Sequence, residues 1–191
     1  MRNSNLPVTN EIAGQTIKRN DVQEEAMYIE TIDDEAEFEE DVDVGSFNHG
    51  YIQMRLGSLL DQSGKVTPVS ELSLDITGID LATFDLSLKE EIKPDIALYE
   101  RRSLSRPFDI LKMKEMPLVA IEILSPRQGS YDILRKFKLY FALGVRSCWL
   151  VDPALATITV YRSMDQHRTF SGGEVYDEPT GIRLPIEDIF S

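Results

Sequence analysis

Apolar residues recur along the chain in two rhythms, one typical of strands and the other typical of helices. The longest apolar run, residues 118–124, is interrupted once, by Glu122. A run of this length that is rich in valine and isoleucine, closed here by Ser125 and Pro126, predicts a strand buried on both faces. In residues 131–143 the apolar positions are spaced by four and three, which predicts a helix with one buried stripe.

The same periodicities predict the other elements. They are a helix at 50–60 with Ser46 as its N-cap, extended segments at 65–70 and 71–76, strands at 94–99, 147–151 and 157–161, and a packed terminal segment at 181–191. Residues 77–92 and 164–173 are predicted to be polar connections. The strand–helix–strand unit at 118–151 predicts a parallel pair with a right-handed crossover. The hairpin adds antiparallel strands, so the expected class is α/β, with a mixed β-sheet flanked by helices.

Two acidic residues are placed on these strands. Glu122 lies in the middle of the apolar run, where a carboxylate is expensive to desolvate unless a positive charge compensates it. Asp95 follows Pro94 at the start of another short apolar strand, a place that suits proline because it cannot donate to a sheet ladder. Lys136, on the predicted helix, lies beside the buried stripe and can point back toward the sheet.

Two interpretations of these three residues are open. Hard cations such as Mg²⁺ prefer oxygen ligands, so two carboxylates with a nearby lysine suit a metal-dependent phosphodiesterase. The lysine would orient the attacking water or neutralise the charge that grows on the phosphate. Alternatively, Glu122 and Lys136 form a structural ion pair and Asp95 caps a turn. Buried pairs seldom add much stability, so the structural alternative has the weaker physical motive.

Four segments in sequence order carry a family resemblance. They are P-D-I-A-L (94–98), V-A-I-E-I-L-S-P (119–126), D-I-L-R-K-F-K-L-Y-F-A-L-G-V (132–145) and W-L-V-D-P (149–153). Together they resemble the Uma2 family, a restriction-endonuclease-like group in the PD-(D/E)XK nuclease superfamily, over roughly residues 45–191. The resemblance implies that Asp95 and Glu122 match the acidic positions of a nuclease core. Leu124 stands where the superfamily pattern has lysine, and Lys136 matches a helix lysine that substitutes for it.

The resemblance implies a Mg²⁺- or Mn²⁺-dependent endonuclease that hydrolyses DNA phosphodiester bonds. Asp95 and Glu122 would hold the metal with the backbone carbonyl of Ile123, and Lys136 would assist the attacking water. The alternative is a catalytically inactive nuclease-fold protein that binds nucleic acid or another protein. DNA is the expected partner, and a homodimer is left open.

His49 and Gln53 lie one turn apart on the predicted helix at 50–60 and its approach. They would reach a scissile phosphate if this helix packs across the site, as the first helix does in similar nuclease folds. His49 is then a candidate catalytic residue and Gln53 a candidate nucleic-acid contact. A histidine at a helix start is also a common surface or capping residue, and this alternative stays open.

Charge is distributed unevenly along the chain. The net charge is −13, but residues 1–44 hold 13 acidic and 3 basic side chains, whereas residues 101–146 hold ten basic and four acidic ones. A local positive field beside two carboxylates is compatible with phosphate recognition. Arg101, Arg102 and Arg127 are therefore candidate nucleic-acid contacts. The plainer interpretation of each is a solvated surface residue.

The acidic composition of residues 1–44 predicts a flexible N-terminal arm, because like charges repel and little apolar area can be buried. The arm would either shield the basic surface or act only as a solubilising tail. Residues 45–191 are then expected to form a single nuclease-like domain. This length is enough for a sizeable core.

Several classes of protein are excluded by what the sequence lacks. The single cysteine, Cys148, excludes an internal disulfide, and no apolar stretch approaches the ~20 residues of a membrane span. With no signal peptide in the N-terminal residues, a cytoplasmic location without a membrane partner is expected. The sequence contains no glycine-rich phosphate loop, GxSxG elbow, CxxC pair or HExxH helix, which argues against nucleotide hydrolases, serine hydrolases and zinc sites.

Overall fold

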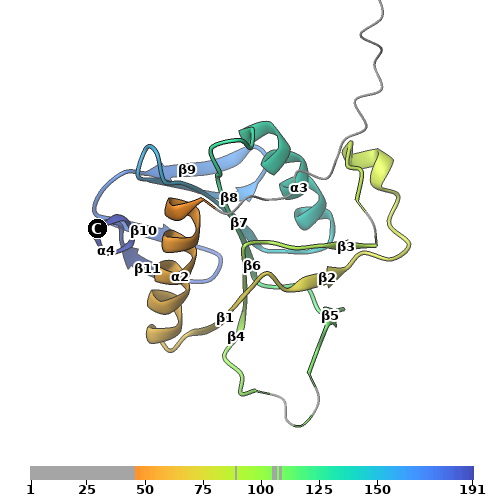
Figure 1. The fold of residues 1–191 in the computed structure, drawn as a ribbon, viewed down its shortest axis with the longest axis horizontal. Coiled ribbons are helices and arrows are strands. Elements are labelled where there is room, and N and C mark those ends of the chain that lie inside the picture. The colour runs from red at the N-terminus through yellow and green to blue at the C-terminus, as the bar shows by residue number, and fades with distance from the viewer. Residues whose placement is uncertain (1–45, 89, 105–106, 108) are drawn as a thin grey trace, which may run out of the picture. The chain divides into compact units, whose positions relative to one another are not determined.

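The computed structural model describes residues 46–88, 90–104, 107 and 109–191. The predicted arm at 1–44 lies outside these residues. The elements are α2 (Phe47–Gln62), β1 (Val66–Ser70), β2 (Ser73–Asp75), η1 (Leu81–Phe84), β3 (Glu91–Ile92), β4 (Ile96–Glu100), β5 (Lys112–Met113), β6 (Val119–Ile123), α3 (Ser130–Ala142), β7 (Ser147–Asp152), β8 (Thr157–Ser163), β9 (Gln166–Phe170), β10 (Glu174–Asp177), β11 (Ile182–Pro185) and α4 (Ile186–Phe190) (Figure 1).

The main sheet has six strands in the order β1-β4-β6-β7-β8-β9. Strands β6 and β7 are parallel and α3 connects them, while the other neighbours are antiparallel. The predicted α/β class and mixed sheet are therefore confirmed. Two smaller sheets, β10-β11 and β3-β2-β5, complete the described sheets.

Two predicted connections were wrong in detail. Residues 164–173 contain β9, because Gln166–Phe170 pair with β8 along an exposed edge where polar side chains face water. Four of the five β9 residues are exposed, so the strand lacks the apolar alternation that marks a half-buried strand. Residues 77–92 contain the short helix η1 and the two-residue strand β3.

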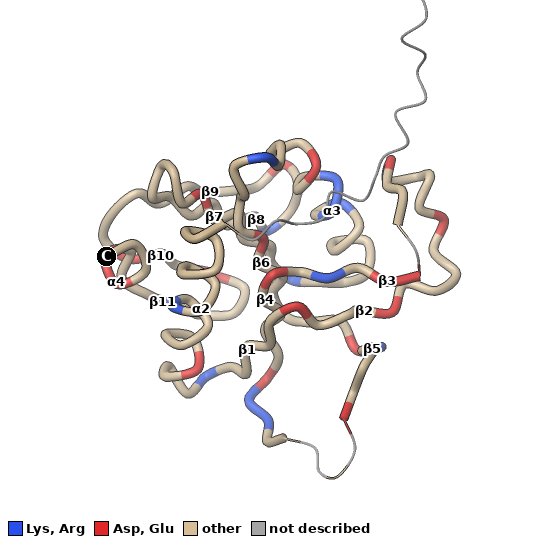
Figure 2. Tube along the Cα trace, in the orientation of Figure 1, with Lys and Arg blue, Asp and Glu red and all other residues tan. Residues whose placement is uncertain are grey.

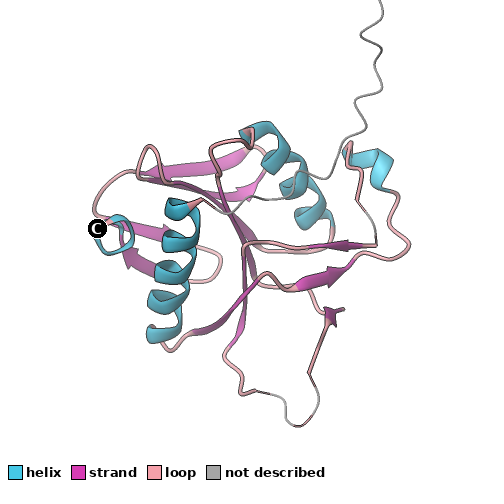
Figure 3. Cartoon of the chain, in the orientation of Figure 1, coloured by secondary structure: helices cyan, strands magenta, loops and turns pink. Residues whose placement is uncertain are grey.

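The two main helices cover opposite faces of the sheet (Figures 1 and 3). Residues of α2 pack with alternate β6 residues, Val119, Ile121 and Ile123, in one hydrophobic cluster. Residues of α3 pack with Ala120 and with Cys148 of β7 in a second cluster. This division follows from strand geometry, because successive side chains point to opposite faces. Glu122 therefore shares the α3 face with Ala120.

Local signals fix the ends of both helices. The side chain of Ser46 accepts a hydrogen bond from the backbone N–H of His49 and so caps the start of α2, as predicted. After α3, Gly144 adopts a left-handed conformation with φ of 93°, which glycine tolerates without a steric penalty. Among the described residues, no helix is both long and apolar enough to cross a lipid bilayer.

Candidate active site

The pairing of β4 with β6 brings the two acidic residues together. The register pairs Ile96 with Ile121 and Ala97 with Ala120. Continuing it by one residue places Asp95 opposite Glu122, and side chains of directly opposed residues lie on the same face of a sheet. Both side chains are buried, with 6% of Asp95 and 2% of Glu122 exposed. Residues far apart in sequence thus form one buried acidic pair where β4 begins and β6 ends.

Glu122 is held by two residues of α3. Lys136 Nζ lies 2.9 Å from Glu122 Oε2, and the Tyr140 hydroxyl donates to Oε1 at 2.7 Å. Burial raises the pKa of Glu122 to about 7, and the negative charge of Asp95 also raises it, although Lys136 and Tyr140 act in the opposite direction. Burial likewise raises the pKa of the Tyr140 hydroxyl, so Tyr140 stays protonated and donates.

Asp95 is held by the main chain of β6 and by α2. The backbone N–H of Ile123 donates to Asp95 Oδ2 at 2.5 Å. Nε2 of His49 lies 3.2 Å from the same oxygen, in a largely buried contact. The Gln53 side-chain amide donates to the Asp95 carbonyl oxygen at 2.8 Å. Helix α2 therefore reaches the site with both of its predicted residues, which contact Asp95.

Glu71 is a further acidic residue beside this pair. The Gln53 amide also donates to Glu71 Oε1 at 2.7 Å, and the Glu71 backbone N–H donates to the Asp95 carbonyl at 3.2 Å. Glu71 has a positive φ of 53°, which is unusual for a residue with a side chain. Nothing in the local sequence marks this conformation. Sequence reasoning therefore missed Glu71.

Tyr140 was missed as a site residue for a different reason. Its spacing in α3 placed it correctly on the buried stripe with Phe137, and both are buried. Its hydroxyl is the part that reaches Glu122, and an apolar stripe gives no sign of that. The available signal was its position four residues after Lys136, because residues at that spacing lie on one helix face.

The three candidate arginines are placed differently. Arg101 forms an ion pair with Asp61, and Arg102 forms a two-pronged pair with Glu115 at 3.0 and 2.8 Å. Arg127 is exposed in the turn between β6 and α3. Basic and acidic residues are interspersed along the described chain (Figure 2). Of the three, Arg127 follows most closely on the strand that carries Glu122.

Comparison with protein families bears on this arrangement. The family model for Uma2, described as a putative restriction endonuclease, matches residues 25–187. The chain belongs to the Uma2 family. Among solved structures, a putative nuclease belonging to DUF820 from Anabaena variabilis is similar, with 20% identity and a TM-score of 0.58 over 76% of this chain and 82% of that chain. This likeness shows a shared fold. A comparison with curated proteins finds no match.

Membership of the Uma2 family supports a nuclease function, and nucleases of the restriction-endonuclease type generally use divalent metals. Among the described residues, no three His, Cys, Asp or Glu side chains are grouped so that they could hold a metal ion. Mg²⁺ does not require such a group, since it is commonly bound by one or two carboxylates, with waters and substrate phosphates completing its shell. The buried acidic pair brings the carboxyl oxygens of Asp95 and Glu122 to one place, and burial raises the pKa of Glu122 to about 7 despite Lys136. The oxygen donors of this pair are of the kind that a hard divalent cation takes.

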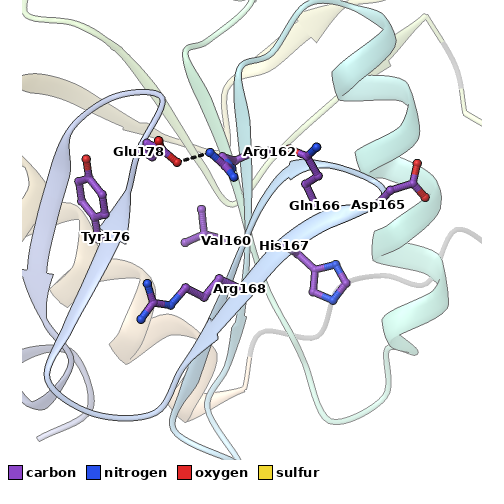
Figure 4. Close-up of a pocket in the computed structure, with 8 residues that line it drawn as sticks. All are labelled: Val160, Arg162, Asp165, Gln166, His167, Arg168, Tyr176 and Glu178. Carbon is purple, nitrogen blue, oxygen red and sulfur yellow. Dashed lines mark hydrogen bonds and ion pairs between the residues drawn. The ribbon is translucent and has the colours of Figure 1, made fainter.

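A groove elsewhere on the Uma2 domain is separate from this pair. It is lined by Val160, Arg162, Asp165, Gln166, His167, Arg168, Tyr176 and Glu178, from β8, β9, β10 and their connections (Figure 4). Arg162 pairs with Glu178 across it. The groove has mixed charge and includes neither Asp95 nor Glu122.

Proposed function

We propose that this Uma2 protein is a metal-dependent endonuclease that hydrolyses phosphodiester bonds in DNA. One observation carries the proposal: Asp95 and Glu122 are buried, adjacent strand positions, with the Lys136 ammonium 2.9 Å from Glu122. The Lys136 ammonium offsets part of the cost of burying two carboxylates side by side, and a purely structural site would gain little from that burial.

Each residue has a role in this proposal. Asp95, Glu122 and the Ile123 carbonyl hold the cation, which when bound polarises the phosphate and lowers the pKa of water. Lys136, about a quarter exposed, can extend from Glu122 toward a phosphate at the mouth of the site. There it would stabilise the negative charge that develops as the bond breaks.

Residues of α2 and the exposed loops support the pair. His49 keeps Asp95 Oδ2 oriented, and Gln53 fixes the backbone at Asp95, so both act on the carboxylate before they act on DNA. Arg127 is the most accessible candidate for a DNA phosphate contact. Arg101 and Arg102 would have to open their ion pairs with Asp61 and Glu115 to bind DNA.

The test is a cleavage assay with the purified chain on supercoiled plasmid, linear duplex, single-stranded DNA and duplex RNA. Cleavage should require Mg²⁺ or Mn²⁺ and stop with EDTA. The variants Asp95→Asn and Glu122→Gln should be inactive while keeping the wild-type circular dichroism spectrum. Cleavage that stays with the purified chain in both variants, or in EDTA, would reject the proposal. Nucleic-acid binding without cleavage under any metal condition would favour an inactive nuclease-fold binding protein.

A further inference from the structure

We propose that Tyr140 is a positioning residue for Glu122. The Tyr140 hydroxyl fixes one carboxylate oxygen of Glu122 in the interior, and the other oxygen remains able to exchange its partner for a cation. The inference deepens the proposed function, because it assigns different tasks to the two oxygens of one metal-binding carboxylate. It rests on that function only for the identity of the cation.

The two partners of Glu122 differ in access to solvent. Tyr140 is completely buried, and its hydroxyl donates to Oε1 at 2.7 Å. Lys136 is about a quarter exposed, and its ammonium meets Oε2 at 2.9 Å. They lie one turn apart on the same face of α3, so both contacts to the Glu122 carboxylate come from one helix. The Oε2 side is therefore the side that solvent and ions can reach.

Tyr140 is suited to hold its oxygen still. Its ring packs against Phe137, with 6.5 Å between ring centroids, within the buried cluster under α3. A locked aromatic ring cannot follow a rotating carboxylate, whereas a lysine side chain has four flexible bonds and can. If Glu122 turned away, the Tyr140 hydroxyl would be left buried and unpaired, which is unfavourable. The hydroxyl thus selects one orientation of Glu122.

The first experiment reads the orientation without any metal. It measures hydrogen exchange of lysine ammonium groups by ¹H–¹⁵N NMR in the metal-free protein, with Lys136 assigned by its absence in Lys136→Met. Lys138, exposed and two residues away, gives the fast-exchange reference. Tyr140→Phe removes only the hydroxyl, so the Glu122 carboxylate is free to rotate away from Lys136. Hydrogen exchange at the Lys136 ammonium should then become about tenfold faster, the size of effect expected when an ordinary hydrogen bond is lost.

Tyr99 provides a matched control. It is also a buried tyrosine, and its hydroxyl donates to the backbone oxygen of Glu115 at 3.3 Å and not to either carboxylate. Tyr99→Phe therefore loses one partly buried tyrosine hydrogen bond and should leave Lys136 exchange at the wild-type rate. Equal exchange rates in wild type and Tyr140→Phe would overturn the proposal. So would wild-type exchange at Lys136 as fast as at Lys138.

The second experiment reads the consequence for metal. Calorimetric titration with Mn²⁺ should show about ten- to hundredfold weaker binding to Tyr140→Phe than to wild type, the range for removing a partner that orients a ligand. Tyr99→Phe should bind like wild type. Equal Mn²⁺ affinity of wild type and Tyr140→Phe would overturn the positioning role.

The two proposals can fail separately. If wild type does not bind Mn²⁺, the metal-dependent function fails, and lysine exchange still decides the role of Tyr140. If Tyr140→Phe does not fold, the wild-type protein supplies the measurement through the hydroxyl proton of Tyr140. A slowly exchanging hydroxyl signal that is lost in Glu122→Leu, which has no acceptor oxygen, supports the contact, and its absence from wild type overturns the proposal.

Discussion

Asp95 and Glu122 are both buried but are held in different ways. Each contacts two residues four apart on one helix, His49 and Gln53 of α2 for Asp95, and Lys136 and Tyr140 of α3 for Glu122. The Asp95 carboxylate also accepts a main-chain N–H, from Ile123, whereas both oxygens of Glu122 are met by side chains. The geometry of Asp95 is therefore fixed largely by the sheet, while that of Glu122 depends on α3.

The largest effect should come from removing either negative charge. Asp95→Asn should lower metal-dependent cleavage by at least about 100-fold, because an amide is a poor ligand for a hard cation. The fold should persist, because the asparagine oxygen can still accept the Ile123 N–H. Single-turnover rates with thermal melts measure both effects. If most of the variant is insoluble and its soluble, folded fraction cleaves at the wild-type rate, Asp95 is a structural residue.

Replacing one helix residue that contacts each carboxylate, Lys136 for Glu122 and His49 for Asp95, tests the comparison between the two. Lys136→Met should lower the cleavage rate by about 100-fold, because in the proposed mechanism its charge would act on the reacting phosphate. His49→Gln should lower it by about tenfold, because it acts through Asp95, which the Ile123 N–H still holds. Lys138→Met, at an exposed position of the same helix, is the control and should cleave at the wild-type rate. A larger loss in His49→Gln than in Lys136→Met would reverse the comparison.

The pH dependence of stability should report on Glu122. Its pKa is about 7 in the folded protein against an ordinary value of 4.5, so the folded state retains a proton that the unfolded chain releases in this range. The resulting stability is complete below pH 4.5 and is lost as the pH rises through 7. The loss amounts to about 3 kcal/mol in unfolding free energy.

Glu122→Gln removes this ionisation, so the stability of the variant relative to wild type should increase between pH 5 and pH 8. Urea unfolding at the two pH values measures it. Glu174→Gln, at an exposed position, is the control and should show no such relative gain. A wild-type slope retained in Glu122→Gln would place the titrating group elsewhere.

The smallest effect should come from Gln53. Gln53→Leu removes the bridge between Glu71 and the Asp95 carbonyl, yet that carbonyl still accepts the Glu71 N–H, so the loss should be about 1 kcal/mol in unfolding free energy. Gln62→Leu removes an exposed contact with Ser58 on the same helix and should change stability by less than about 0.5 kcal/mol. Equal losses in the two variants would mean that the bridge contributes nothing specific.

Periodicity and composition predicted the features that depend on local sequence. The run at 118–124 predicted β6, and the parallel β6–β7 pair followed from the connecting helix. Strand β9 escaped prediction, because an exposed edge strand carries polar residues that also suit a loop. The contacts of Tyr140 and Glu71 were not predicted either. The Tyr140 contact depends on which group its buried hydroxyl meets, and the Glu71 contact depends on a backbone angle set by tertiary packing.

The order in which the site can assemble follows from chain separation. Glu122 is 14 residues from Lys136 and 18 from Tyr140, all within the β6–α3–β7 unit. Asp95 is 28 residues from Ile123 and 42 from Gln53. Closing longer loops has a larger entropic cost, so we expect the Glu122 half to form earlier in folding than the Asp95 half. Kinetic φ-values should accordingly be higher for truncations of Ile133 in α3 than for truncations of Ile52 in α2. An acidic pair that closes last is exposed to solvent, and to metal ions, until the final docking of α2.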